Sequence, residues 1–314
     1  SRQVILSLSP SLEGENERGC PILYSKFYIH SSMNILTNIL TNKKKEIALA
    51  TRACSLAEMK RFAKAYRAKR RSFAKALRQK PVGLIAEIKL KSPSAGKLTE
   101  GGFEEIAKLY AKSKASAISV LTDKQYFGGS LDYLAKVRNI CKQPILRKDF
   151  IIDEYQVYES VLAGADALLL IVAALSPKRL KELLLLTEAV GLDALVEVHS
   201  GSELTKAVKA GASIIGINNR NLKTLKIDVR TTEAVMRFAP KGKTYVSESG
   251  ISTKEDVLRV KKCGVHAILV GSSIVAAPDR KAKIRELSLP SAPLQRGSAE
   301  SSRRRGVSYF RHCS

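Results

Sequence analysis

The stretch VGLIAEIKLKSPSAG, residues 82–96, brings two side chains of opposite charge to a place where acid–base chemistry could occur. An apolar run leads into Glu87 and Lys89 and then breaks at a Ser-Pro-Ser-Ala-Gly loop, which is typical of a buried strand that ends in a turn. Side chains two residues apart on a strand point to the same side, so the carboxylate and the ammonium share one face. A structural ion pair would give the same pattern, and this stretch alone does not separate the two interpretations.

More polar side chains follow short apolar runs later in the chain. A packed strand avoids charged groups unless they are paired or used, so each of these positions needs an explanation. The positions are Thr122-Asp123, Lys148-Asp149, Glu197, Asn218-Asn219-Arg220 and Ser247-Glu248-Ser249. A structural salt bridge explains any one of them, but so many polar strand ends pointing into one mouth favour a functional site.

Two lysines and two glutamates in this set indicate a class of reaction. An ammonium such as that of Lys89 or Lys148 can protonate or polarise a carbonyl oxygen. A carboxylate such as that of Glu87 or Glu197 can accept a proton or stabilise a cation. The set therefore indicates acid–base chemistry at a carbon next to a carbonyl, for which no metal ligands are needed.

Two further segments, SESG at 247–250 and VGSS at 270–273, place small residues ahead of expected helices. Backbone N–H groups at such turns can face an anion. Ordinary tight turns also use Gly and Ser, but with both segments present we favour a phosphate site. In a barrel enzyme, phosphate is frequently held by the loops after the seventh and eighth strands.

A regular alternation of short β-rich runs and longer amphipathic segments follows residue 80. The strand candidates are Gly83–Ile88, Ala117–Leu121, Pro144–Lys148, Asp166–Ile171, Ala194–Val198, Ser213–Ile217, Thr244–Ser247 and His266–Val270. The helix candidates are Gly102–Lys114, Ser130–Cys141, Asp153–Ala163, Ser176–Val190, Ser200–Ala210, Asp228–Phe238, Thr253–Lys262 and one from Ser273 onward. Eight βα units over about 200 residues match a (β/α)8 TIM barrel better than a doubly wound sheet.

The sequence thus predicts one barrel domain over residues 81–287 with additions at both ends. Residues 33–80 are helical in pattern, and residues 1–32 and 288–314 are expected to be poorly ordered. Residues 43–80 carry 14 Lys and Arg against 2 Glu, a large share of the net charge of +25. We expect a solvated helix face over residues 60–80, because no aromatic interleaving supports nucleic-acid binding.

Composition excludes several other classes. The five cysteines form no CxxC pair and the four histidines have no ligand spacing, so neither a disulfide framework nor a metal site is indicated. The longest apolar stretch, Ala167–Leu175, is about half of what a membrane span needs. No secretory leader is recognised in the N-terminal run Val4–Leu8, and we expect a cytoplasmic protein.

Seven motifs in order carry a resemblance to indole-3-glycerol phosphate synthases. They are IAEIKLKSPSAG (85–96), SVLTDKQYFGGS (119–130), PILRKDFIIDEYQVYE (144–159), ALVEVHS (194–200), IGINNRNL (215–222), VSESGI (246–251) and VGSS (270–273). The resemblance runs from about Met33 to about Leu287. It implies the ring closure of 1-(2-carboxyphenylamino)-1-deoxyribulose 5-phosphate to indole-3-glycerol phosphate, CO₂ and water in tryptophan biosynthesis, with no cofactor.

The resemblance also implies roles for individual residues. Lys148 would be the general acid on the substrate carbonyl, Glu197 would act in the dehydration and Glu87 would assist. Lys89 would pair with the substrate carboxylate or phosphate, and it is the second candidate for the general acid. The residues expected to bind substrate are Ser92, Phe127, Phe150, Asn218, Arg220, Leu222 and Ser249, and those expected to bind phosphate are Gly250, Gly271 and Ser272.

Further expectations concern the N-terminal helix and partners. The Met33–Ile47 helix resembles the additional helix that lies over the barrel mouth in this family. The partner is a small phosphorylated substrate, with no membrane or nucleic acid; a monomer is expected, and association with other enzymes of the same pathway is allowed. The basic 52–80 segment, the lack of Trp and the two tails depart from the family pattern.

Two other functions compete with this interpretation. A phosphosugar isomerase or epimerase would share the fold and an acid–base pair, but it would have no use for the aromatic side chains Phe127 and Phe150. A nucleic-acid-binding protein would use Lys60–Lys80 and Arg303–Arg305. A salt-dependent shift with RNA would indicate the latter.

Overall fold

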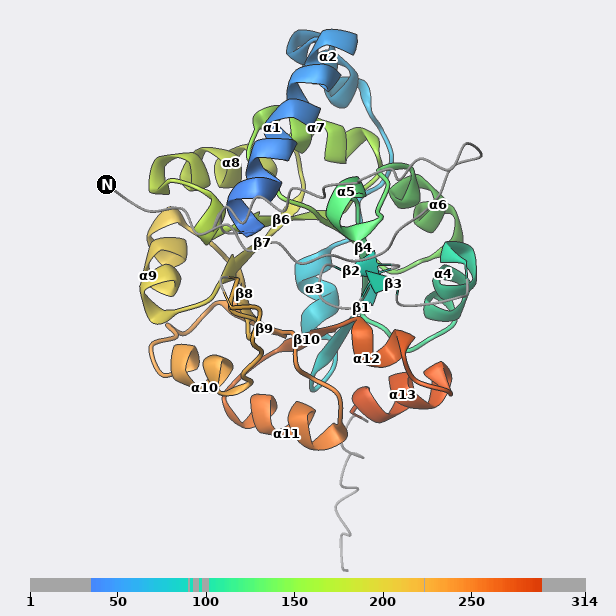
Figure 1. Ribbon diagram of the computed structural model, residues 1–314, viewed down its shortest axis with the longest axis vertical. Helices are drawn as coiled ribbons and strands as arrows, with labels where there is room; N and C mark the ends of the chain where they lie inside the picture. The colour runs from blue at the N-terminus through green and yellow to red at the C-terminus, as the bar shows by residue number, and fades with distance from the viewer. Residues whose placement is uncertain (1–34, 90, 93–95, 98–101, 223, 290–314) are drawn as a thin grey trace, which may run out of the picture. The chain divides into compact units, whose positions relative to one another are not determined.

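A closed barrel of eight parallel strands forms the centre of the computed structural model, which describes residues 35–89, 91–92, 96–97, 102–222 and 224–289 (Figure 1). In chain order the barrel strands are β1 Gly83–Ile88, β4 Ala117–Leu121, β5 Ile145–Lys148, β6 Ala167–Ile171, β7 Asp193–Val198, β8 Ile214–Asn218, β9 Thr244–Glu248 and β10 Ala267–Val270. Strand β10 pairs with β1 and closes the ring. All eight predicted strands are confirmed, each to within one residue.

The helices between the strands also follow the predicted order and surround the barrel (Figure 1). They are α4 Phe103–Ala111, α6 Asp132–Ile140, α7 Glu154–Leu162, α8 Pro177–Ala189, α9 Gly201–Ala210, α10 Arg230–Met236, α11 Lys254–Lys262, α12 Ser272–Val275 and α13 Arg280–Leu287. Four elements were not predicted: the helix α5 Lys124–Phe127, the antiparallel pair β2 Lys91–Ser92 and β3 Gly96–Lys97, and the 3₁₀ turn Val172–Ala174. No helix in the described residues is long and apolar enough to cross a bilayer.

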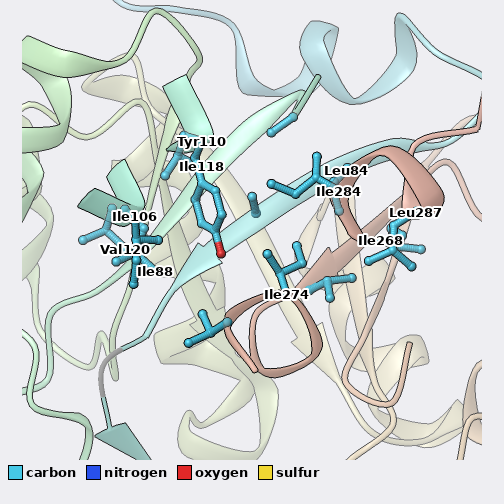
Figure 2. Close-up of a cluster of buried hydrophobic side chains, with 14 of the residues drawn as sticks. Leu84, Ile88, Ile106, Tyr110, Ile118, Val120, Ile268, Ile274, Ile284 and Leu287 are labelled. Atoms are coloured by element: carbon cyan, nitrogen blue, oxygen red, sulfur yellow. The ribbon is translucent and has the colours of Figure 1, made fainter. Parts of the chain in front are cut away.

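Two apolar layers explain why the strands are apolar runs rather than alternating ones. One set of side chains, such as Ile85, Leu146 and Leu195, fills the inside of the barrel. The alternate set packs outward against the helices, as Leu84 and Ile118 do against α4, α12 and α13 (Figure 2). Burial of both faces is the rule for parallel strands covered by crossover helices.

The N-terminal helical segment comprises α1 Ile35–Ala53, α2 Leu56–Ala65 and α3 Phe73–Arg78. Leu36 and Ile39 of α1 pack with Phe150 and Ile171 at the carboxyl ends of the strands, so α1 covers the mouth as expected. The helix α3 lies within the ring of strands in Figure 1, and Phe73 at its start is fully buried. The amides of Phe73 and Ala74 donate to Asp193, the first residue of β7, so α3 closes the opposite end of the barrel.

The basic charges of the 60–80 segment serve in part to hold this segment against the barrel. The Arg70 guanidinium donates to the carbonyls of Val161 and Ala165, and that of Arg71 donates to the carbonyl of Gln143. The prediction of a solvated helix face is therefore wrong for these two arginines. Their partners are backbone carbonyls of βα units at the N-terminal end of the barrel. The periodicity of the sequence gives no indication of these contacts.

The predicted 1–32 extension, and the 288–314 tail beyond Leu289, lie outside the described residues.

Lys43 on α1 is the point at which this helix is anchored to the mouth. Its ammonium lies 3.1 Å from Asp123 Oδ2 and 3.0 Å from Asp149 Oδ1, and 4% of its side chain is exposed. Asp123 accepts the amide N–H of Tyr126 at the start of α5, and Asp149 accepts the amide N–H of Phe150. One lysine therefore joins α1 to the ends of two strands.

Replacing Lys43 with methionine should lower the free energy of unfolding by about 3–5 kcal/mol, because two buried carboxylates lose their shared cation. Urea unfolding followed by circular dichroism measures the change. Lys44→Met is the matched control, since Lys44 is an exposed neighbour on the same helix. A loss no larger than that of the control would show that the buried network does not anchor α1.

Candidate active site

One cavity of about 330 Å³ lies at the carboxyl ends of the barrel strands. The predicted residues that line it are Glu87, Lys89, Phe127, Lys148, Phe150, Glu197, Asn218, Arg220, Leu222, Ser249, Gly250, Gly271 and Ser272. Only Ser92 of the predicted set is missing, and its side chain lies outside the part of the chain that the structure describes. Residues spread over 186 positions of sequence, from Glu87 to Ser272, therefore surround one space.

Lys148 at the end of β5 lies between two carboxylates. Its Nζ is 3.4 Å from Glu197 Oε2 on β7 and 3.3 Å from Glu248 Oε2 on β9. Both glutamates are almost completely buried, and 15% of the lysine side chain is exposed toward the cavity. The ammonium is thus the most accessible member of a buried charged trio.

The surroundings push the pKa values of the two carboxyl groups apart. Burial raises the pKa of Glu197, but the charges of Lys148 and His199 and a hydrogen bond with Asn218 outweigh it, so the pKa of Glu197 lies below its ordinary value. Burial, with the negative charges of Glu197 and Glu87, raises the pKa of Glu248 to about 8 although Lys148 opposes the shift. Near neutral pH the site therefore holds one carboxylate and one carboxylic acid, an arrangement that separates a base from an acid.

The pKa of Lys148 is raised, because the attraction of Glu248 once it is ionised, and of Glu197 and Glu87, exceeds the effect of its burial. The lysine therefore stays protonated at neutral pH and is suited to act as an acid. A proton leaves it readily only when a substrate atom with growing negative charge takes the place of a carboxylate as its partner.

Glu248 is a functional candidate at a strand end that the predicted set of site residues lacks. The motif SESG predicts a phosphate turn, and that prediction gives its glutamate no role. Its carboxyl group fits inside the barrel because Gly216 on the neighbouring strand has no side chain: a Cβ there would lie 2.0 Å from Glu248 Oε1. A glycine inside an apolar strand run beside an acidic strand end is the pattern that could have indicated it.

Glu87 and Lys89 lie at the end of β1 and form the ion pair expected from their spacing, with Nζ 3.4 Å from Glu87 Oε1. Gly271 lies against this pair, because a Cβ at that position would be 2.7 Å from the same oxygen. The ammonium of Lys89 lines the cavity together with the small residues that follow β9 and β10. It is therefore placed to meet an anionic part of a ligand.

Two asparagines at the end of β8, Asn218 and Asn219, make different contacts. Asn218 hydrogen-bonds Glu197 and accepts the backbone N–H of Arg220, so it orients the carboxylate at the cavity wall. Asn219 points away from the cavity and bonds Ser247 and Thr232 in a buried network. Only the first of these two asparagines lines the cavity.

Part of the cavity lining is apolar. Phe127 on α5 and Phe150 after β5 have ring centroids 6.2 Å apart and an interplanar angle of 33°. Leu222, which follows β8 across the barrel, also lines the cavity. A flat aromatic group can be held by area and by offset ring contacts at such a wall.

The turns after β9 and β10 form a rim of small residues. Ser249 and Gly250 both adopt positive φ, 65° and 80°, which a serine tolerates only at some cost. The hydroxyl of Ser273 donates to the carbonyl of Ile251 at 3.0 Å and ties the two turns together. This rim is where the sequence predicted a phosphate, and its role stays a prediction.

Comparison with known proteins agrees with this geometry. A family model described as indole-3-glycerol phosphate synthase matches residues 36–287. An indole-3-glycerol phosphate synthase of Caldanaerobacter subterraneus subsp. tengcongensis is 46% identical over 250 residues, which is 79% of this chain and 96% of the relative. One of Dehalococcoides mccartyi strain CBDB1 is 52% identical over 216 residues, which is 67% of this chain and 83% of the relative.

A solved structure resembles the barrel at low sequence identity. The 3-hexulose-6-phosphate synthase of Salmonella typhimurium superposes with a TM-score of 0.54 and 13% identity, covering 66% of this chain and 97% of that chain. At this identity the likeness extends to the fold alone.

Proposed function

Because the chain belongs to the indole-3-glycerol phosphate synthase family, we propose that its mouth cavity is where the reaction of that family takes place. The enzyme is a carbon–carbon lyase of tryptophan biosynthesis that closes the indole ring with loss of CO₂. The observation that carries the proposal is the position of Lys148, between a carboxylate and a carboxylic acid in a cavity that two phenylalanines also line.

The substrate has three parts that match three regions of the cavity. Its carboxyphenyl ring fits the apolar lining, with Phe127 and Phe150 after β4 and β5 and Leu222 across the barrel after β8. Its phosphate fits the rim at Gly250, Gly271 and Ser272, next to the turns whose backbone N–H groups can bind an anion. Lys89 lies where it can pair with the carboxylate or the phosphate, and Asn218, Arg220 and Ser249 line the region between for the ribulose hydroxyls.

In the condensation, the ring carbon that bears the carboxylate attacks the substrate ketone. The carbonyl oxygen gains negative charge and takes a proton from the Lys148 ammonium, which makes an alcohol. The C–C bond to the carboxylate then breaks, CO₂ leaves, and its electron pair restores the aromatic ring. This half of the reaction consumes one proton, and the Glu248 carboxylic acid, 3.3 Å from Lys148 Nζ, can return one to the lysine.

In the dehydration, the new hydroxyl leaves as water and the neighbouring carbon loses a proton. The carboxylate of Glu197 accepts that proton or stabilises the cation that precedes it, while a protonated neighbour supplies the proton for the departing hydroxyl. The Glu87 carboxylate contributes to the same field, since its charge acts on both Lys148 and Glu248. This half of the reaction is neutral in protons.

Location and partners complete the proposal. The thiols of Cys54, Cys141 and Cys263 are free, which suits a reducing compartment and supports a cytoplasmic enzyme. Its partner is the phosphorylated substrate, and a monomer and an association with other enzymes of the pathway stay predictions.

Mass spectrometry of the product tests the proposal against an isomerase of the same fold. The purified protein should convert 1-(2-carboxyphenylamino)-1-deoxyribulose 5-phosphate into a product that is lighter by one CO₂ and one water. A product of unchanged mass would indicate an isomerase or epimerase. Recovery of unreacted substrate from correctly folded protein would contradict the proposed function.

A further inference from the structure

His199 lies two residues beyond Glu197 and fills a gap between that carboxylate and helix α9. Its Nε2 is 3.4 Å from Glu197 Oε1, whereas the other oxygen of the same carboxylate faces Lys148 at 3.4 Å. Its Nδ1 is 3.2 Å from Glu203 Oε2 in the first turn of α9. Both ring nitrogens of one histidine therefore lie near carboxylate oxygens, Nδ1 in a hydrogen bond with Glu203 and Nε2 in an ion-pair contact with Glu197 that lacks hydrogen-bond geometry.

Glu203 is itself fixed, so the ring has little freedom to turn. The Glu203 carboxylate also accepts the backbone N–H of His199 at 2.7 Å, and the backbone N–H of Glu203 donates to the hydroxyl oxygen of the N-cap Ser200. The side chain of His199 is 13% exposed. The orientation of the imidazole is thus set by its outer partner rather than by solvent.

A neutral imidazole does not suit this position in either tautomer. It has one N–H, so one nitrogen would present a lone pair to a carboxylate oxygen. An imidazolium has two N–H groups and can pair with Glu203 and Glu197 at once. Burial disfavours the charge, but Glu203 and Glu197 favour it, as does Glu248 on β9 once it is ionised, and the pKa of His199 is raised.

We propose that His199 is a positioning residue that binds Glu197 as an imidazolium and keeps it an oriented carboxylate opposite Lys148. Each oxygen of Glu197 then has its own cation, His199 on Oε1 and Lys148 on Oε2. This explains how two buried glutamates on neighbouring sides of one lysine adopt different protonation states. Glu197 forms an ion pair with this second cation, whereas the ion pair of Glu248 in the described residues is with Lys148. The inference rests on the proposed role of Glu197.

Nitrogen-15 NMR of the histidine rings tests the charge of His199 without any turnover. In the wild-type protein both ring nitrogens of His199 should be protonated at pH 7, with titration above the ordinary value of about 6.5. His199→Gln identifies the resonance by its loss, and Glu203→Gln should bring the titration to lower pH. His266, whose pKa burial and the nearby Arg78 lower, serves as an internal reference at the other end of the barrel. A His199 ring that is neutral at pH 7 would overturn the proposal.

Kinetics then separate positioning from mere support of the fold. His199→Gln retains a donor for Glu197 but not the charge, so kcat should fall about tenfold, as for other outer partners of functional groups, with KM nearly unchanged. The acid limb of the kcat profile should move to higher pH, because Glu197 loses a neighbouring cation. Glu203→Gln should move it in the same direction by less. An unshifted limb in both variants would contradict the proposal even if the wild type is fully active, whereas an inactive wild type would count against the proposed function itself.

Discussion

Replacing Lys148 with alanine should lower kcat by about 10²–10⁴-fold, the usual contribution of a positioned general acid. Among the described residues that line the cavity, Lys148 is the ammonium that lies between two buried glutamates. Without it, the carbonyl oxygen of the substrate has no equally placed proton donor. KM should change little, because the ring and phosphate contacts remain and the lysine acts on the transition state. Steady-state kinetics measure both constants.

Two variants control this experiment. Lys142→Ala removes an exposed lysine shortly before β5 and should leave kcat unaltered. Lys148→Arg keeps the positive charge, but a guanidinium releases a proton far less readily than an ammonium and is a larger, planar group. The kcat of this variant should therefore stay low. A Lys148→Ala enzyme with the wild-type kcat would transfer the general-acid role to Lys89.

Replacing Glu197 with glutamine should reduce kcat by a similar factor of about 10²–10⁴, through the dehydration step rather than the condensation. Glutamine has nearly the same shape but cannot accept a proton or offset a cation. The change also removes a negative charge that raises the pKa of Glu248, so Glu248 should ionise at lower pH in this variant. Because the dehydration is slowed and the condensation is not, the alcohol formed by the condensation should accumulate. Mass spectrometry of quenched reactions detects it.

The pH dependence of the wild type gives the reference for this variant. The pKa of Glu197 is lowered, so its carboxylate is lost only when the pH falls well below neutral. The pKa of Glu248 is raised to about 8, so its proton is lost as the pH rises through that value. The kcat profile should thus be bell-shaped, and Glu197→Gln should move its alkaline limb to lower pH. Glu188→Gln, at an exposed end of α8, is the control, and wild-type kinetics in Glu197→Gln would exclude the proposed role.

Much of the barrel could be predicted because its physical signals are local. A strand such as ALLLI in β6 is buried on both faces, which requires a continuous apolar run, and its neighbours repeat that run at βα spacing. The polar residues that end these runs then fall on one rim by topology alone. For that reason the sequence alone assigns Lys148 and Glu197, 49 positions apart, to one site, and in the structure Lys148 Nζ lies 3.4 Å from Glu197 Oε2.

The features that were missed depend on contacts between distant segments. The buried place of α3 follows from the pairing of its first amides with Asp193, and nothing in the short sequence FAKALR indicates it. The roles of Arg70 and Arg71 follow from carbonyls that only the closed barrel presents. The protonation of Glu248 depends on burial and on the charges of Glu197 and Glu87, which a strand-end motif does not reveal.

The time course of indole fluorescence tests the central claim most directly. Purified wild-type protein, mixed with 1-(2-carboxyphenylamino)-1-deoxyribulose 5-phosphate, should show a steady rise in indole emission that is proportional to enzyme concentration. The Lys148→Ala protein, folded as judged by circular dichroism, should show almost none. If the wild type is folded and no emission develops, or if the lysine variant matches it, then the mouth cavity does not close the indole ring through Lys148.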